Sequence, residues 1–209
     1  MNDAQSNLEK SIVHIVDDDD AVRYALIQLF NSVNLENQAY ASGDDFIETF
    51  TGDHTGCLVI DIRMPGMSGL EVQRALKDKG VEIPVIVITG HGDVETGVRA
   101  MKSGAFDFIQ KPFSDQTLLG AVQSAIQKHT EQRVGAEERD HITKMFSSLS
   151  GREREILDKI LNGEPNKRIA GTLNLSEKTI EYHRANIMKK MAAHSLADLI
   201  KKTLSIEMH

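Results

Sequence analysis

Short apolar segments alternate with amphipathic ones along the first half of the chain. The apolar segments are only a few residues long, which is typical of strands rather than helices. The first, third and fourth of them are almost continuously hydrophobic, as expected for strands covered on both faces of a sheet. We predict five strands, at residues 11–16, 38–41, 57–61, 85–89 and 105–109.

The segments between these strands have the three- and four-residue spacing of amphipathic helices, as Val72, Ala75 and Leu76 illustrate. A further, long helix begins near Ser114. Strands that alternate with helices predict a parallel sheet with right-handed crossovers. We therefore expect a doubly wound, flavodoxin-like α/β domain with five strands and five helices. The four helices between the strands are expected at residues 20–34, 43–50, 68–79 and 93–103.

The hydrophobic face of the long helix fades in a charged stretch at residues 129–141. This stretch is either a solvated extension of the helix or a flexible linker, and Gly135 counts against an unbroken helix. We favour a helical linker at residues 129–145. It would join a first domain at residues 10–128 to a second domain at residues 146–209.

Only helical spacing is found after Ser150. Ser176 follows a leucine and is placed to cap a helix that begins after it. About sixty residues are enough for a small all-α domain. We predict four helices there, at residues 151–162, 166–173, 177–191 and 195–204.

The composition is that of a cytoplasmic globular protein with no membrane partner. The 209-residue chain is 40% hydrophobic, and none of its apolar runs approaches the length needed to cross a bilayer. No charged-then-apolar leader opens it. Its one cysteine, Cys57, cannot form an internal disulfide, and we expect a small buried hydrophobe rather than a redox group.

Charge is distributed unevenly along the chain. Residues 1–128 carry 10 Lys and Arg against 19 Asp and Glu, a net charge of −9. The remaining residues carry 14 against 12, a net charge of +2. The difference predicts two units with different partners, but the basic excess is too small to indicate nucleic-acid binding by itself.

Asp61 ends one of the predicted strands, and a run of turn-forming residues follows it. The carboxyl ends of parallel strands form the edge where open α/β sheets bind ligands. An acidic cluster at residues 17–20 and a Lys-Pro pair at residues 111–112 follow two other strands. Singly, each motif has an ordinary explanation, such as a solvated helix start or a loop. Together they indicate a metal-assisted phosphoryl acceptor.

The first domain resembles the receiver domain of bacterial two-component response regulators. The resemblance implies that Asp61 accepts a phosphoryl group from a sensor histidine kinase. The motifs that carry it are Val16-Asp17-Asp18, Asp61 with Met64-Pro65-Gly66, Thr89-Gly90, and Lys111-Pro112-Phe113.

The same resemblance assigns roles around Asp61. Mg²⁺, for which Mn²⁺ or Ca²⁺ can substitute, would bind carboxylates of Asp17 or Asp18 and of Asp61, and the backbone carbonyl of Arg63. We favour Asp18 for direct contact with the metal, with Asp17 assisting or bound through water. Lys111 would pair with the phosphoryl oxygens, and the hydroxyl of Thr89 would donate a hydrogen bond.

Phe108 stands where this family carries an aromatic residue that turns inward when the threonine moves toward the phosphoryl group. The alternative is an ordinary buried aromatic of the sheet, and one side chain can be both. We expect phosphorylation of Asp61 to draw Thr89 inward and to reposition Phe108.

The second domain resembles the LuxR-type helix-turn-helix of FixJ/NarL response regulators, in segments 149–157, 166–170, 175–180 and 183–191. Helical spacing places Ile180, His183, Ile187 and Met191 of the third helix on the core. On the opposite face, Glu181, Tyr182 and Ala185 are candidates to read bases in a major groove. The candidates for phosphate contacts are Lys178, Thr179, Arg184, Lys189 and Lys190.

We interpret the chain as a response regulator rather than an enzyme. When phosphorylated, it would form a homodimer, bind promoter DNA and contact RNA polymerase. One alternative is a phosphatase with Asp61 as nucleophile, but that class needs a second acid where Arg63 stands. Another is a helical domain that binds proteins, but the exposed face of the third helix carries Lys178 and Lys189 rather than an apolar stripe.

Overall fold

The computed structural model describes residues 11–52, 54–90 and 94–207. Its first part is a five-stranded, all-parallel sheet with the strand order β2-β1-β3-β4-β5, which confirms the predicted doubly wound fold. The predicted positions 10, 93, 208 and 209 lie outside the described residues. The strands are β1 (Ile12–Val16), β2 (Glu36–Tyr40), β3 (Gly56–Asp61), β4 (Val85–Thr89) and β5 (Asp107–Gln110).

The two edge strands differ from their predicted bounds. β2 begins earlier, because its ladder to β1 starts at Ile12 opposite Glu36. β5 begins later, at Asp107 opposite Ile86 of β4. Polar side chains at the start of β2 hid it from apolar patterning, whereas the apolar Ala105 and Phe106 precede β5 without belonging to it.

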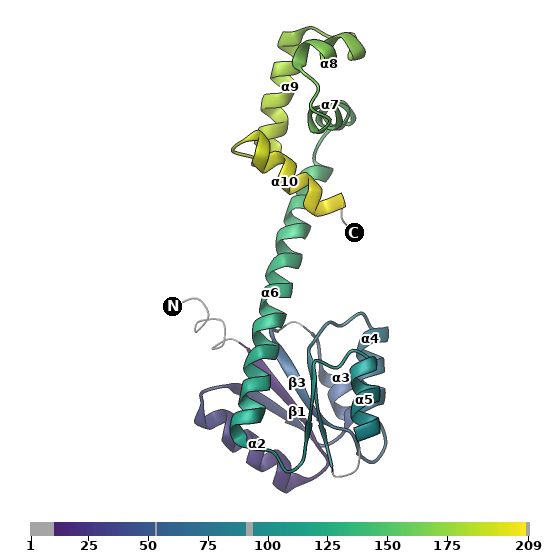
Figure 1. The fold of residues 1–209 in the computed structure, drawn as a ribbon, viewed down its shortest axis with the longest axis vertical. Coiled ribbons are helices and arrows are strands. Elements are labelled where there is room, and N and C mark those ends of the chain that lie inside the picture. Colours follow the sequence, from purple (N-terminus) through teal and green to yellow (C-terminus); the bar gives the residue numbers. More distant parts are fainter. Residues whose placement is uncertain (1–10, 53, 91–93, 208–209) are drawn as a thin grey trace. The chain divides into compact units, whose positions relative to one another are not determined.

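Helices cover both faces of the sheet, in two layers that Figure 1 shows. α2 (Asp20–Ser32) and the first part of α6 (Asp115–Ser147) pack on one face, through residues such as Phe30 and Val122. α3 (Gly43–Thr49), α4 (Gly69–Asp78) and α5 (Val94–Lys102) pack on the other. All strand residues of β1, β3 and β4 are buried, which explains why these strands are almost continuously hydrophobic.

Four helices follow, as predicted: α7 (Gly151–Leu161), α8 (Asn166–Leu173), α9 (Glu177–Lys190) and α10 (Leu196–Glu207). Ser150 and Glu153 form a capping box at the start of α7, and the Ser176 hydroxyl accepts from the Thr179 amide at the start of α9. Buried residues from all four helices, and Ile142 of α6, form one apolar core.

The chain divides into two compact units, residues 1–133 and 134–209, and the division falls within α6. Within the first unit, α6 remains attached to the sheet beyond residue 128. The ring Nδ1 of buried His129 lies 2.9 Å from Gly56 O, and Arg133 donates to Gly52 O at 3.2 Å. No helix within the described ranges is long and apolar enough to span a membrane.

Candidate functional site

Three strand ends bring Asp17, Asp61 and Lys111 together at one edge of the sheet. Lys111 Nζ donates to Asp61 Oδ1 at 2.8 Å and to Asp17 Oδ2 at 3.1 Å. Asp17 and Asp61 are 2% and 8% exposed, so both carboxylates are largely removed from water. One ammonium group thus bridges two buried acids that lie 44 residues apart in the sequence.

The backbone after β3 folds back beneath Asp61. The Arg63 amide donates to Asp61 Oδ2 at 2.6 Å, and the Gly69 amide donates to Ile62 O at 3.2 Å. A side-chain carbon added at Gly69 would lie only 2.5 Å from Asp61 O. Only glycine therefore lets the start of α4 lie this close to the backbone of Asp61. Sequence reasoning missed this role, although the Ser68-Gly69 pair at a helix start could have indicated it.

The four acidic residues at positions 17–20 make different contacts. Asp17 points toward Lys111 and accepts from the Asp19 amide at 2.9 Å. Asp19 caps α2 by accepting from the Ala21 amide at 2.8 Å. Asp20 pairs with Arg23, which also donates to Asp17 O at 2.5 Å. The side chain of Asp18 is exposed.

Burial and the short contacts between Lys111 and the two acids shift the pKa values of Asp17 and Lys111. Burial raises the pKa of Asp17, the Asp19 amide and Lys111 oppose that shift, and the neighbouring Asp61 adds to it. Burial alone would lower the pKa of Lys111, but its bonds to Asp61 and Asp17 raise that pKa above its usual value. Lys111 is therefore a fixed positive charge beside two acids.

The donor atoms fit a hard divalent cation in part. The Asp17 and Asp61 carboxylates lie together and are oxygen ligands of the kind that Mg²⁺ prefers alongside retained waters. The described residues contain no group of three or more His, Cys, Asp and Glu side chains placed to hold a metal ion. Asp17, rather than the favoured Asp18, is the acid that shares Lys111 with Asp61.

Thr89 and Phe108 lie on the neighbouring strands. Thr89 ends β4, is 2% exposed, and its Oγ1 donates a long hydrogen bond of 3.4 Å to Gly90 O. Phe108 of β5 is half-buried and packs against the cluster on the α3–α5 face. The peptide bond between Lys111 and Pro112 is cis.

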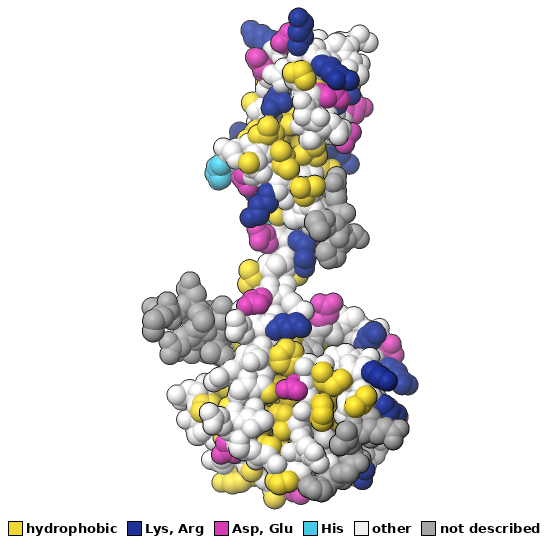
Figure 2. Space-filling model, in the orientation of Figure 1, with side chains coloured by type: hydrophobic (Ala, Val, Ile, Leu, Met, Phe, Trp, Pro, Cys, Tyr) yellow, Lys and Arg dark blue, Asp and Glu magenta, His cyan; other side chains and the backbone are white. Residues whose placement is uncertain are grey.

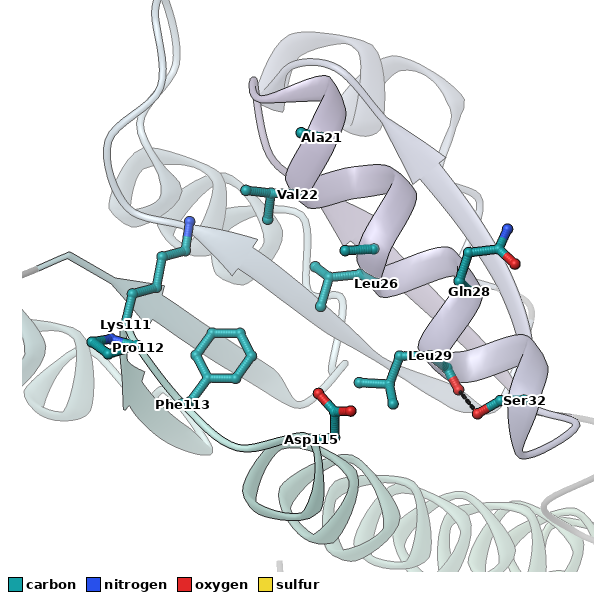
Figure 3. A pocket seen from close by; sticks show the side chains of 11 residues that line it. Ala21, Val22, Leu26, Gln28, Leu29, Ser32, Lys111, Pro112, Phe113 and Asp115 are labelled. Carbon is teal, nitrogen blue, oxygen red and sulfur yellow. Dashed lines mark hydrogen bonds between the residues drawn. The ribbon is translucent and has the colours of Figure 1, made fainter.

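An open, mostly apolar groove of about 730 Å³ adjoins Lys111. Figure 3 shows Leu26 and Leu29 of α2 on one side of it and Phe113 on the other, with the Lys111 side chain at one end. The side chain of Lys111 is 29% exposed. Of the three residues Asp17, Asp61 and Lys111, only Lys111 lines this groove.

The exposed face of α9 carries the predicted base-reading residues. Glu181, Tyr182 and Ala185 are exposed, as are Lys178 and Lys189, whereas Ile180, Ile187 and Met191 are fully buried. Figure 2 shows Lys and Arg side chains, interspersed with acidic ones, over the part of the molecule formed by α8 and the start of α9. Thr179 is half-buried, and its hydroxyl bonds to that of Ser176.

Two residues of α9 differ in exposure from their predicted roles, His183 in the core and Arg184 at a phosphate. His183 is only half-buried, although its Nδ1 is shielded from water and has no hydrogen-bond partner in the described part of the chain. Arg184 is half-buried and lines a small cavity beside Ile160 and Met188.

Lys190 is bound within the domain. Its Nζ donates to Glu153 Oε2 at 2.7 Å and to Ser148 O at 3.3 Å. Glu153 is 4% exposed and also accepts from the Ser150 amide. The bond to Lys190 and that amide lower the pKa of Glu153 to about 2. Sequence reasoning missed Glu153, although the Ser-x-x-Glu spacing at residues 150–153 signals a capping box.

The comparisons with known proteins match both halves of the chain. The family described as response regulator receiver domain matches residues 13–123, and the luxR family of bacterial regulatory proteins matches residues 147–203. The response regulator protein TodT of Pseudomonas putida is 43% identical over 193 residues, which cover 92% of this chain and 85% of TodT.

Two further relatives extend the match. The transcriptional regulatory protein FixJ of Rhizobium meliloti is 42% identical over 193 residues, or 92% of this chain and 95% of FixJ. The solved structure of the response regulator StyR has a TM-score of 0.87 at 42% identity, covering 93% of this chain and 98% of StyR.

The chain belongs to the two-component response regulators that combine a receiver domain with a LuxR-type DNA-binding domain. Its relatives are regulators of transcription rather than enzymes. Membership implies a histidine kinase as the source of the signal and DNA as the target.

Proposed function

We propose that Asp61 is the phosphoryl acceptor of this response regulator, and that its phosphorylation controls promoter binding through α9. The observation that carries the proposal is the bridge from Lys111 Nζ to Asp61 and Asp17 at the carboxyl edge of the sheet. A carboxylate attacks a phosphoryl donor poorly unless the negative charge between them is neutralised. A lysine held beside the nucleophile supplies part of that neutralisation.

Each residue of the site has a task in the transfer. As an Asp61 Oδ forms the new bond to phosphorus, the bond between phosphorus and the donor breaks, and the rest of the donor leaves with the electron pair of that bond. Lys111 pairs with an oxygen of the transferred group, and the Arg63 amide keeps the Asp61 carboxylate oriented at 2.6 Å. Thr89 turns its hydroxyl from Gly90 O toward the phosphoryl oxygens. The movement of Thr89 then repositions the side chain of Phe108.

Mg²⁺ would be held by Asp61, by Asp17 or Asp18, and by the backbone carbonyl of Arg63. When bound, it supplies charge neutralisation at the phosphoryl oxygens. Mn²⁺ or Ca²⁺ would occupy the same oxygen ligands.

Removal of divalent cations with a chelator is expected to slow phosphorylation by a small phosphodonor at least about tenfold, because Lys111 alone leaves most of the phosphoryl charge uncompensated. Phosphate-binding gel electrophoresis measures the rate, and added Mg²⁺ should restore it. An unchanged rate after chelation would remove the metal from the proposal.

The acceptor itself is tested by chemical trapping. The full-length protein is treated with a small phosphodonor, the acyl phosphate is reduced with borohydride, and the reduced aspartate is located by mass spectrometry. We expect the label at Asp61. A label at Asp17 or Asp18 instead would contradict the assignment.

We assign the receiver to residues 10–128, the linker to 129–145 and the DNA-binding domain to 146–209. A phosphorylated homodimer that contacts RNA polymerase in the cytoplasm is the form that we propose acts at promoters. The exposed basic and polar face of α9 supports the DNA contact. Glu181, Tyr182 and Ala185 would read bases, whereas Lys178, Thr179, Arg184 and Lys189 would contact phosphates.

Lys189 and Lys190 are adjacent but are expected to behave differently on substitution. Lys189→Met removes an exposed charge from the DNA-facing side, so affinity should fall and the slope of log affinity against log salt should decrease by about one. Lys190→Met removes the partner of Glu153, so the main effect should be on stability. Fluorescence anisotropy with promoter DNA at several salt concentrations measures the slope. Equal salt slopes for both variants would contradict the distinction.

A further inference from the structure

The ring of Phe108 rests against Gly97 of α5. A side-chain carbon built on Gly97 would lie 2.8 Å from Cδ2, 3.1 Å from Cε2 and 3.2 Å from Cγ of Phe108. Carbon atoms in favourable contact are about 3.5–4.0 Å apart. The obstruction involves the body of an aromatic ring rather than a flexible tip, so the ring or the helix must move to relieve it.

The described inward-facing residues of α5 are small. Among residues 97–102, whose side chains are described, only Gly97 and Ala100 are buried. Gln73 of α4 donates a long hydrogen bond of 3.4 Å to Ala100 O, and its Oε1 is buried without a partner in the described part of the chain. Over residues 97–102, the described side of α5 that faces inward thus consists of two small residues, and the Phe108 ring packs against the first of them.

Phe108 is also connected to the phosphorylation site. It pairs with Val87 of β4, and Thr89 pairs with the next but one residue of β5, Gln110. Lys111 follows Gln110 directly and donates its backbone amide to Thr89 O at 2.7 Å. One short stretch of paired strand thus connects Phe108 to Thr89 and Lys111.

We propose that Gly97 is a positioning residue for the conformational switch. Because Gly97 has no side chain, the Phe108 ring can occupy the space beside it, which we call the seat. In this conformation the Thr89 hydroxyl is directed at Gly90 O. The size of residue 97 thus sets how readily the receiver leaves this conformation. The proposal rests on the proposed function of Asp61 for its link to phosphorylation. The seat itself is a contact that can be tested separately.

Alanine in place of a helical glycine usually stabilises a helix, because glycine loses more backbone freedom on folding. At Gly97 the contact with Phe108 opposes this gain. Gly120 of α6 is a matched control, since nothing lies within 4 Å of an added side-chain carbon there. The variants needed are Gly97→Ala, Gly120→Ala, Phe108→Leu and the double variant Gly97→Ala/Phe108→Leu.

The first readout is ¹⁹F NMR of the full-length protein labelled with 4-fluorophenylalanine. The Phe108 resonance is identified by its loss in Phe108→Leu. We expect Gly97→Ala to shift or split this resonance and Gly120→Ala to leave it unchanged. An unaltered Phe108 resonance in Gly97→Ala would overturn the proposed seat, whatever the phosphorylation data show.

The second readout is the rate of phosphorylation by acetyl phosphate. Filling the seat disfavours the conformation in which Thr89 bonds to Gly90 O, so Gly97→Ala should react at least about threefold faster than the unsubstituted protein. In the Phe108→Leu background the same substitution should change the rate by less than about 1.5-fold, because the obstructing ring is gone. A slower rate, an unchanged rate, or an equal effect in both backgrounds would overturn the switching role. A failure of Asp61 to accept phosphate would be detected independently by the trapping experiment.

Discussion

Asp61→Asn is expected to reduce phosphorylation by a small phosphodonor at least about 100-fold, to the limit of detection. The amide is a far weaker nucleophile than the carboxylate that Lys111 holds at 2.8 Å. It also removes one of the two carboxylates that Lys111 bridges, and the bond to Asp17 remains. Phosphate-binding gels and intact-protein mass spectrometry after incubation with acetyl phosphate measure the loss.

The matched control is Asp20→Asn, in the same acidic cluster as Asp17. The Asp20 side chain is 92% exposed and pairs with Arg23 at the start of α2. We expect the rate of this variant to stay within about twofold of the unsubstituted protein, because an exposed ion pair contributes little. Asp61→Asn should retain weak basal DNA binding, which shows that it is folded. Undiminished phosphorylation of Asp61→Asn would place the acceptor elsewhere.

Glu153→Gln is expected to lower the free energy of unfolding of the DNA-binding domain by about 2 kcal/mol at neutral pH. Glutamine can still accept from the Ser150 amide, so the substitution isolates the charge that pairs with Lys190 at 2.7 Å. The pKa of Glu153 near 2 by itself implies a larger loss of unfolding free energy than this. The Lys190 side chain is 39% exposed, however, and water screens part of the interaction.

This stabilisation should depend on pH in one direction. The folded-state pKa of Glu153 lies below its unfolded value of about 4.3, so the contribution is complete above that pH. It is lost as the pH falls toward the folded value of about 2. The stability difference between Glu153→Gln and the unsubstituted protein should therefore shrink between about pH 5 and pH 3.

Hydrogen exchange measured by mass spectrometry on peptides from α7 and α9 reports this local stability in the full-length chain. Glu155→Gln serves as control, because Glu155 is 58% exposed and pairs with Arg152 on the same helix. We expect its effect to stay below about 0.5 kcal/mol at every pH. A pH-independent difference for Glu153→Gln would mean that packing, rather than charge, accounts for its effect.

The fold was largely predictable because strands buried on both faces, such as β1, β3 and β4, are almost continuously hydrophobic in sequence. The position of Asp61 at the carboxyl edge of the sheet was predictable for the same reason, since Asp61 ends one of these strands. Which of Asp17 and Asp18 contacts Lys111 was not predictable from spacing. Neighbouring residues at a strand end point in different directions, and only the structure shows that Asp17 faces Lys111.

Other features depend on contacts between segments distant in sequence. Helical spacing placed Lys190 among the phosphate contacts, but its ammonium group reaches Glu153 on another helix. The closeness of Gly97 to Phe108 depends on how α5 packs on β5, which no local pattern encodes. Such pairings are set by tertiary packing rather than by the periodicity of one element.

The polar composition of β2 has a consequence for the behaviour of the protein in solution. An edge strand presents unpaired backbone groups that can recruit a strand from another molecule. Glu36, Asn37 and Gln38 line this edge with charged and amide side chains, and the opposite edge, β5, is only four residues long. These features discourage growth of the sheet from copy to copy. The residues that obscured the start of β2 in the sequence thus help to protect the protein against aggregation.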